Sequence, residues 1–253
     1  MNKRGFTLAE VLITLGIIGV VAAMTLPTLI KNYQKQVWAI SAKKSYAVVS
    51  NMFQKMMADE GVSSITDTTL FTKGICVFTN NNSNSCEDAY GNPSILLNII
   101  PKYLKIIKVC EGNECNLKYK DIVLDNTGKL SYEIFGGALV EADTLTYARG
   151  KVYGFYANDG AIYYISFGGW GDEENASSNA SIKICFDTNG EKGPNIRGRD
   201  TFCMEYCRNK NGKITSFLNG SSCWADYSEA DLENYQAQYP IIHLIKNGWK
   251  MDY

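Results

Sequence analysis

The spacing of apolar positions divides the chain into a first segment of membrane length and a longer remainder with alternating runs. Twenty consecutive uncharged residues extend from Val11 to Ile30. At about 1.5 Å per residue, a helix over this run is about 30 Å long, which matches the hydrocarbon thickness of a bilayer. The run therefore predicts a membrane-spanning helix.

The apolar periodicity continues beyond this run. Apolar residues recur mostly every three or four positions as far as residue 57, and Lys31, Lys35, Lys43 and Lys44 lie between them. We predict an amphipathic continuation of the helix to about residue 59, ended by Gly61. The lysines are interpreted as a solvated face, with binding to lipid phosphates or DNA as the alternative. The predicted stripe consists of Ile30, Tyr33, Val37, Ile40, Val48 and Met52, widened by Tyr46, Val49, Phe53 and Met57.

Residues 61–253 carry short alternating runs that are separated by Gly, Asn and Asp, which is typical of antiparallel strands. Residues 93–109 are interpreted as an amphipathic helix interrupted or kinked at Pro101, with a pair of apolar strands as the alternative. A long helix packed on an antiparallel sheet is an α+β fold. The predicted hairpins are 151–156 with 161–167, 121–124 with 130–135, and 241–245 with 249–253, and further strands are predicted at 183–186 and 212–215.

All eight cysteines lie beyond residue 75, and none lies in the apolar run. An even number confined to one side of a membrane span indicates disulfides formed in an oxidising compartment. Local spacing favours Cys76–Cys86 and Cys110–Cys115. Three pairings remain open among the other four. A Cys207–Cys223 bond would close a loop of about 15 residues and stabilise the fold by roughly 3 kcal/mol. A zinc site is the less favoured alternative, because no second short Cys/His pair accompanies Cys203 and Cys207. The remaining four are Cys185, Cys203, Cys207 and Cys223.

The segment from Asp187 to Asp200 is a candidate calcium site. Oxygen-bearing side chains alternate at Asp187, Asn189 and Glu191, and Asp200 can close the shell. No bidentate Glu stands at the far end as in an EF-hand. The alternative is an Asx-rich Gly-Pro turn, tied by Asp187 and an Arg199 salt bridge.

Catalytic patterns find little support in this sequence. The chain has one histidine, His243, within an apolar run that is interpreted as a partly buried strand. It has neither a phosphate-binding loop nor a dinucleotide fingerprint. A net charge of −1 and a pI near 5.9 disfavour a dominant nucleic-acid binder. We predict a protein that is not an enzyme and requires no nucleic acid.

The first ten residues are the most specific part of the chain. A carboxylate at the front of a membrane helix is costly and is usually paired, so Glu10 requires an explanation. A secretory signal peptide has a shorter apolar core, and a plain anchor accounts for neither Gly5-Phe6 nor Glu10. The stretch Lys3 to Glu10 resembles the processing site of type IV pilins and type II secretion pseudopilins. Ala9 departs from the commoner Ile or Val of that family.

The resemblance implies a role for individual residues. Gly5 would precede the bond that the prepilin peptidase cuts, and Phe6 would become the methylated amino terminus. Glu10 would be the assembly carboxylate that faces the amino group of a neighbouring subunit. Gly19 and Pro27 fall where pilin helices often carry a loosening Gly and a kinking Pro.

The resemblance also implies an organisation and a function. We expect a leader at 1–5, a transmembrane and assembly helix at 6–30, its amphipathic continuation at 31–60, and an extracytoplasmic pilin-like α+β domain at 61–253. Lys3 and Arg4 would keep the amino end in the cytoplasm, so the protein would be a single-pass inner-membrane protein before assembly. Its partners would be prepilin peptidase/N-methyltransferase and other pilin or pseudopilin subunits. The expected function is a structural subunit, minor or specialised, of a pilus or pseudopilus, and the alternative is an anchored surface adhesin, receptor or DNA-uptake pilin.

Overall fold

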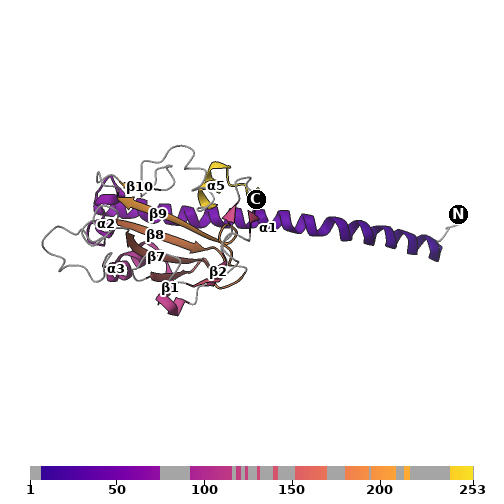
Figure 1. The fold of residues 1–253 in the computed structure, drawn as a ribbon, viewed down its shortest axis with the longest axis horizontal. Helices are drawn as coiled ribbons and strands as arrows, with labels where there is room; N and C mark the ends of the chain where they lie inside the picture. The colour runs from indigo at the N-terminus through magenta and orange to yellow at the C-terminus, as the bar shows by residue number, and fades with distance from the viewer. Residues whose placement is uncertain are drawn as a thin grey trace, which may run out of the picture.

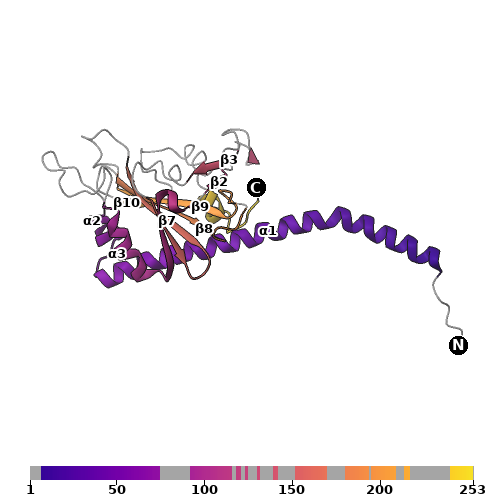
Figure 2. The ribbon, with the colours of Figure 1, turned by 90° about the horizontal axis from the view of Figure 1, so that it is seen from below.

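A computed structural model gives the architecture of the chain as one long helix beside an antiparallel sheet (Figure 1). The amino-terminal half of the helix extends beyond the domain, and its carboxyl-terminal half runs along the sheet (Figures 1 and 2). The predicted α+β, pilin-like arrangement is confirmed. The residues that the structure describes are 7–74, 92–115, 118–120, 123–124, 130–131, 139–141, 152–169, 180–193, 195–208, 214–216 and 240–252.

The long helix α1 spans Leu8–Glu60, close to the predicted bounds. Gly61 ends it in the left-handed conformation, with φ of 66°, and its amide donates to carbonyls of the last turn. Glycine adopts this conformation without the penalty that a Cβ imposes, so the predicted stop is confirmed. The shorter helices are η1 (Ile65–Asp67), α2 (Thr69–Thr72), α3 (Ser94–Tyr103), η2 (Gly112–Cys115) and α5 (Pro240–Lys246).

Six strands form the main sheet in the order β1-β6-β7-β8-β9-β10, and each described pairing is antiparallel. The predicted hairpin 151–156 with 161–167 is confirmed as β6 and β7. These strands are β1 (Ile106–Glu111), β6 (Val152–Ala157), β7 (Ile162–Gly169), β8 (Ala180–Asp187), β9 (Thr201–Arg208) and β10 (Ile214–Ser216).

Two smaller pairs accompany the main sheet. β3 (Val123–Leu124) pairs with β4 (Leu130–Ser131), which confirms the predicted hairpin of 121–135 in its described part. β2 (Lys118–Lys120) pairs with β5 (Leu139–Glu141). The sequence interpretation did not predict this second pair.

The inner face of the main sheet packs on α1. A row of directly opposed aromatic residues crosses four strands through Phe155, Tyr163, Phe186 and Phe202, and each is fully buried. Burying one large apolar side chain contributes roughly 1.5–3 kcal/mol, so this row is a major part of the core. The facing residues of α1 are Ala39, Ala42, Val49, Met52, Phe53 and Met56.

The outer face carries a second buried cluster. Across β1, β6, β7, β8 and β9 the aligned positions are Cys110, Gly154, Tyr164, Cys185 and Cys203. Successive strand residues point to opposite faces, so this row lies one position away from the inner aromatic row. The sheet is therefore buried on both faces along its middle strands.

The buried stripe of α1 begins later than the periodicity predicts. Ala39 is the first buried residue of the helix. Five apolar positions from Leu29 onward stay uncovered: four precede the point where the domain reaches the helix, and Ile40 lies on the outward side of the helix beyond it. These are Leu29, Ile30, Tyr33, Val37 and Ile40, with 65%, 52%, 66%, 40% and 69% of their surface exposed.

The predicted element at 93–109 divides into two. α3 continues through Pro101 to Tyr103, and the chain then becomes extended and enters β1 at Ile106. The helix interpretation is right for the first part and wrong for the second. α3 continues past Pro101 to Tyr103, so the predicted interruption at Pro101 does not occur.

The predicted strand pair at the carboxyl end is wrong. Residues 240–246 form α5, and a tight turn through Gly248 and Trp249 closes it, with the Trp249 amide donating to the Leu244 carbonyl at 2.6 Å. A short apolar run has no period that separates a buried strand from a buried helix turn. Pro240 at the first helical position favours the helix.

Candidate functional site

A capping box fixes the start of α1 and the position of Glu10. The Thr7 amide and hydroxyl both donate to Glu10 Oε2 at 2.8 Å, and the Glu10 amide donates to Thr7 Oγ1 at 3.3 Å. This reciprocal arrangement satisfies amides that have no partner within the helix. Both recorded hydrogen bonds to the carboxylate end on Oε2, and the Glu10 side chain is exposed. The sequence interpretation missed this cap, although the spacing Thr-x-x-Glu predicts it.

The predicted processing residues lie just before the cap. Gly5 and Phe6 are outside the described residues, and α1 begins at Leu8. Their assignment as the cleavage site therefore stays a prediction.

The first half of α1 presents apolar side chains on all sides. It is the helix in the described part of the chain that is long and apolar enough to cross a membrane, and none of its most apolar stretch is buried. A helix that is apolar all round requires a nonaqueous environment or other helices around it. The exposed large side chains in this half are Leu8, Val11, Leu12, Ile13, Leu15, Ile17, Ile18, Val20, Val21, Met24, Leu26, Leu29 and Ile30.

Gly19 and Pro27 both lie inside the unbroken helix. A Cβ at Gly19 would meet nothing within 4 Å, so that face is open. Pro27 removes one amide donor from the ladder. The helix is bowed rather than straight (Figure 2). The role of the two residues as loosening points stays a prediction.

Two disulfides lie on the outer face of the sheet. Cys110–Cys115 forms as predicted and closes β1 onto η2. Cys185–Cys203 joins directly opposed residues of β8 and β9. The second bond resolves part of the pairing that the spacing left open. Cys207 belongs to β9, but its side chain, like Cys76, Cys86 and Cys223, lies outside the described residues.

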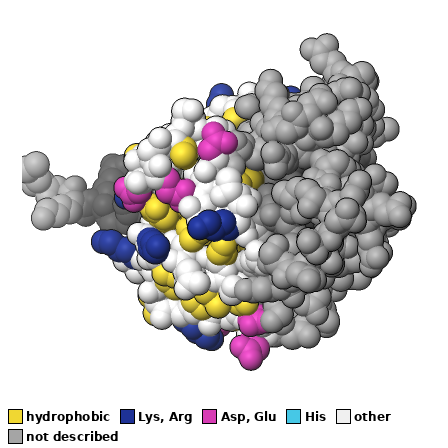
Figure 3. Space-filling model, turned by 90° about the vertical axis from the view of Figure 1, so that its left-hand side faces the viewer, with side chains coloured by type: hydrophobic (Ala, Val, Ile, Leu, Met, Phe, Trp, Pro, Cys, Tyr) yellow, Lys and Arg dark blue, Asp and Glu magenta, His cyan; other side chains and the backbone are white. Residues whose placement is uncertain are grey.

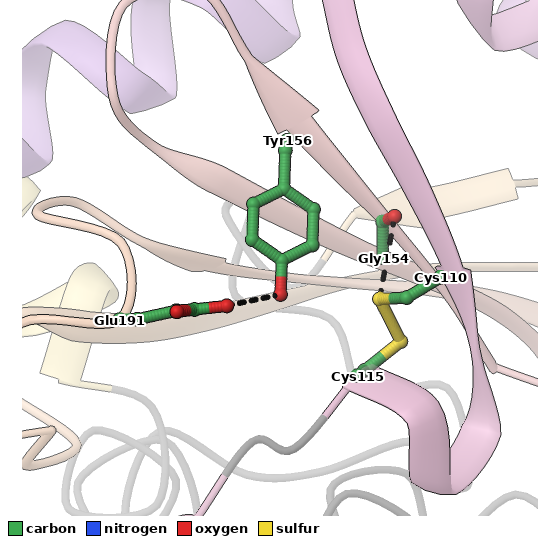
Figure 4. Close-up of a disulfide and its surroundings, with 5 residues drawn as sticks. All are labelled: Cys110, Cys115, Gly154, Tyr156 and Glu191. Atoms are coloured by element: carbon green, nitrogen blue, oxygen red, sulfur yellow. Dashed lines mark hydrogen bonds between the residues drawn. A yellow bond between two sulfur atoms is a disulfide. The ribbon is translucent and has the colours of Figure 1, made fainter.

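Gly154 makes room for the first disulfide. Cys110 Sγ lies 3.6 Å from the Gly154 carbonyl oxygen (Figure 4). Because a disulfide sulfur carries no hydrogen, this is a close packing contact. A Cβ on Gly154 would lie 2.5 Å from Cys110 Sγ and 3.0 Å from both Cys115 Sγ and the Tyr164 ring, so glycine lets the disulfide pack closely on β6.

The Asp187–Asp200 loop brings three of the four candidate calcium ligands together. The Asn189 side-chain amide donates to Asp200 Oδ2 at 3.3 Å, and the Asn189 backbone amide donates to Asp187 Oδ1 at 3.1 Å. Asp200 also accepts from the amides of Asn195 at 2.9 Å and Ile196 at 2.6 Å. Both carboxylates are fully buried. The loop is thus organised around two buried acids.

The fourth candidate ligand is engaged elsewhere. Tyr156 donates its hydroxyl to Glu191 Oε1 at 2.9 Å, and Glu191 is exposed (Figure 4). Among the described residues, no group of three or more Asp, Glu, His or Cys side chains is arranged to hold a metal ion. The calcium site therefore stays a prediction: the carboxylates of Asp187 and Asp200 lie near each other, and the Asn189 side chain faces Asp200 with its nitrogen rather than its oxygen.

The buried acids hold protons more tightly than exposed ones. Burial is the main cause that raises the pKa of Asp187 to about 8; the nearby Asp200 acts in the same direction, and hydrogen bonds from the Asn189 and Gly190 amides oppose both. Burial also raises the pKa of Asp200, again against backbone hydrogen bonds. Asp187 Oδ2 has no hydrogen-bond partner among the described residues. The Thr201 hydroxyl lies close enough to lower the Asp187 pKa slightly, but no hydrogen bond of normal geometry joins them.

His243 lies in α5 rather than in the predicted strand. Its Nε2 lies 2.7 Å from Asp252 Oδ1, and Asn247 donates to the other carboxylate oxygen at 2.7 Å. The hydrogen bond from His243 is the main cause that lowers the pKa of Asp252. These contacts hold Asp252 against α5, so we assign His243 a structural role.

Comparison with known families bears on the first 26 residues. A family model described as the prokaryotic N-terminal methylation motif matches residues 1–26. The chain therefore carries the prepilin-type signal of type IV pilins and pseudopilins, a class of structural subunits. No curated protein and no solved structure gives a significant match to the chain.

Proposed function

We propose that the protein is a structural subunit, minor or specialised, of a type IV pilus or a type II secretion pseudopilus. The observation that carries the proposal is the methylation motif at residues 1–26, which runs into a helix whose apolar half is not covered by any described part of the chain. Such a surface is stable in a bilayer and then in a bundle of similar helices. The domain would lie on the extracytoplasmic side, where its disulfides can form.

The capping box gives Glu10 a defined place in assembly. With two donors on Oε2, the carboxylate can accept a further donor on Oε1. In a filament, that donor would be the α-amino group of Phe6 from a neighbouring subunit. An ion pair in the low dielectric of a helix bundle is stronger than in water, and only one axial offset forms it. The pair would therefore set the register between subunits.

The first test is the chemical state of the amino terminus. The chain is expressed in membranes with and without a prepilin peptidase, extracted and examined by mass spectrometry. The expected mature chain begins at methylated Phe6. A chain that retains Met1 in the presence of the peptidase, or that is cut after the apolar run, contradicts the proposal.

The second test separates the charge of Glu10 from its capping role. Glu10→Gln keeps an acceptor for the capping box but removes the charge, whereas Glu10→Ala removes both. We expect both variants to insert into membranes and both to be poorly incorporated into sheared filaments. Thr7→Ser, which keeps the cap, should assemble normally. Normal filaments from Glu10→Gln would show that the charge is not needed.

A further inference from the structure

The segment between the apolar run and the domain, residues 31–38, is a short exposed neck on α1. The apolar run ends at Ile30 and burial begins at Ala39, which sets the limits of this neck. Its eight residues span about 12 Å at about 1.5 Å per residue. Lys31 and Tyr33 are exposed, and Lys35 and Trp38 are partly exposed. Aromatic and long basic side chains are the types that occupy membrane–water interfaces, because each combines an apolar body with a polar end.

The β8–β9 loop, whose described residues are 188–193 and 195–200, reaches the top of the neck at Arg199. The Arg199 guanidinium lies 5.5 Å from the centroid of the Trp38 ring, so this loop contacts α1 where the helix enters the domain. Headgroups occupy roughly 5–8 Å on each side of the hydrocarbon core. A loop about 12 Å above the core lies within a Debye length, about 8 Å, of those headgroups.

Among the described residues, the charges at this level are mainly basic, with Asp252, beside the Trp249 segment that packs on Tyr46, as a nearby exposed acid. No Asp or Glu occurs between Glu10 and Asp59. In the loop, Asp187 and Asp200 at its ends are fully buried, whereas Lys192 is exposed. Arg197 and Arg199 add two further cations to the loop, and Glu191 is its exposed acid. The nearby Asp159 pairs with Lys44 at 3.2 Å.

The opposite end of the domain has a different surface. Figure 3 shows that the described part of that end mixes Lys and Arg with Asp and Glu, among apolar side chains. The described part of that end therefore does not share the mainly basic character of the neck and loop.

We propose that the neck and the β8–β9 loop bind anionic lipid headgroups of the leaflet from which α1 emerges. The basic side chains would hold the domain against the membrane before assembly, and incorporation into a filament would release it. This inference rests on the proposed function, because it requires α1 to be inserted in a bilayer. Charge complementarity and direct continuity with the apolar run favour lipid over a neighbouring subunit as the occupant.

The experiment is hydrogen–deuterium exchange on the full chain, one copy per nanodisc. Discs of phosphatidylcholine alone are compared with discs that contain phosphatidylglycerol. We expect phosphatidylglycerol to slow exchange of residues 188–200 by about fivefold, the factor expected for one basic side chain at an anionic surface. Added salt should remove the difference. Exchange in β7 and β8 should be unchanged and reports that the domain is folded.

Two charge-matched variants test the location. K31Q/K35Q/K192Q removes three lysines at the proposed surface, and K55Q/K73Q/K102Q removes three exposed lysines away from it. The first should lose the lipid effect and the second should keep it. Equal loss in both would assign the effect to net charge and overturn the proposal.

The remaining outcomes separate this inference from the proposed function. A chain that co-purifies with the disc but exchanges equally in both lipids overturns the lipid surface and leaves the anchor intact. A chain that does not enter the disc overturns the anchor itself. Protection of 188–200 in assembled filaments but not in anionic discs overturns lipid in favour of a second copy, and protection by DNA alone overturns it in favour of DNA.

Discussion

The Arg199 guanidinium lies over the Trp38 ring, 5.5 Å from its centroid, and this contact joins the β8–β9 loop to the point where α1 enters the domain. Lys43 lies 5.9 Å from the centroid of the Trp249 ring, which also packs on Tyr46. Two segments far apart in the sequence thus contact the same part of the helix. The arrangement fixes the orientation of the domain on its helix.

A double-mutant cycle on Trp38 and Arg199 should detect their interaction. We expect Trp38→Leu and Arg199→Gln to couple by at least about 0.5–1 kcal/mol, the value for exposed cation–π pairs, because both side chains are partly buried. The measurement is the free energy of unfolding of the full chain in detergent. Additive single effects would contradict the contact.

Stability should fall as the pH rises through the range in which Asp187 stays protonated only in the folded chain. Its pKa is raised from 3.8 to about 8, so between these values the folded state holds a proton that the unfolded state releases. Stability is therefore greatest at the acid end of this window and declines toward pH 8. Asp200, whose pKa is also raised, acts in the same direction.

The melting temperature at pH 5 and pH 8 checks this expectation. Asp187→Asn should reduce the difference between the two values, because it removes the titrating group. Glu114→Gln, at an exposed position on η2, is the control and should leave the difference unchanged. A difference of the same size in Asp187→Asn would exclude Asp187 as its source.

Calcium should oppose the loss of folding stability toward pH 8 if the β8–β9 loop binds the cation. The cation would neutralise two adjacent buried carboxylates, so the calcium prediction requires a higher melting temperature at pH 8 with calcium than with a chelator. Asp200→Asn should abolish the increase, and Glu191→Ala should keep it, because Glu191 is bound by Tyr156. No heat in calorimetry and no shift in melting temperature would leave the Asx-rich turn as the explanation.

Gly154→Ala should destabilise the domain by about 1–3 kcal/mol, the range for overpacking a filled site. Its added methyl group would collide with the Cys110–Cys115 disulfide and the Tyr164 ring. Gly193→Ala is the matched control, because a Cβ there meets nothing within 4 Å, and its effect should stay within about 0.5 kcal/mol. Denaturant unfolding under oxidising conditions measures both, and equal stability of the two variants would contradict the contact.

The features that local sequence determines were predictable. The length of α1 follows from its composition and from Gly61, which favours the left-handed stop. The Cys110–Cys115 bond needs only a turn between residues five apart. The β6–β7 hairpin follows from alternation on both sides of a Gly-containing turn. In each case the residues that decide the structure are neighbours in the chain.

The tertiary structure alone decided the rest. Cys185 pairs with Cys203 because the register of β8 and β9 makes them direct neighbours, and spacing could not select that pairing. Ala39, rather than Ile30, begins the buried face because the sheet reaches only that far along α1. Glu191 is apart from Asp187 and Asp200 because β6 offers it the Tyr156 hydroxyl. Periodicity and turn chemistry act over a few residues, so the sequence alone determined the helix α1 and its amino-terminal signal. Strand register and burial depend on which distant segments meet. Packing therefore decided the β8–β9 loop, the Cys185–Cys203 disulfide and the exposed neck at residues 31–38.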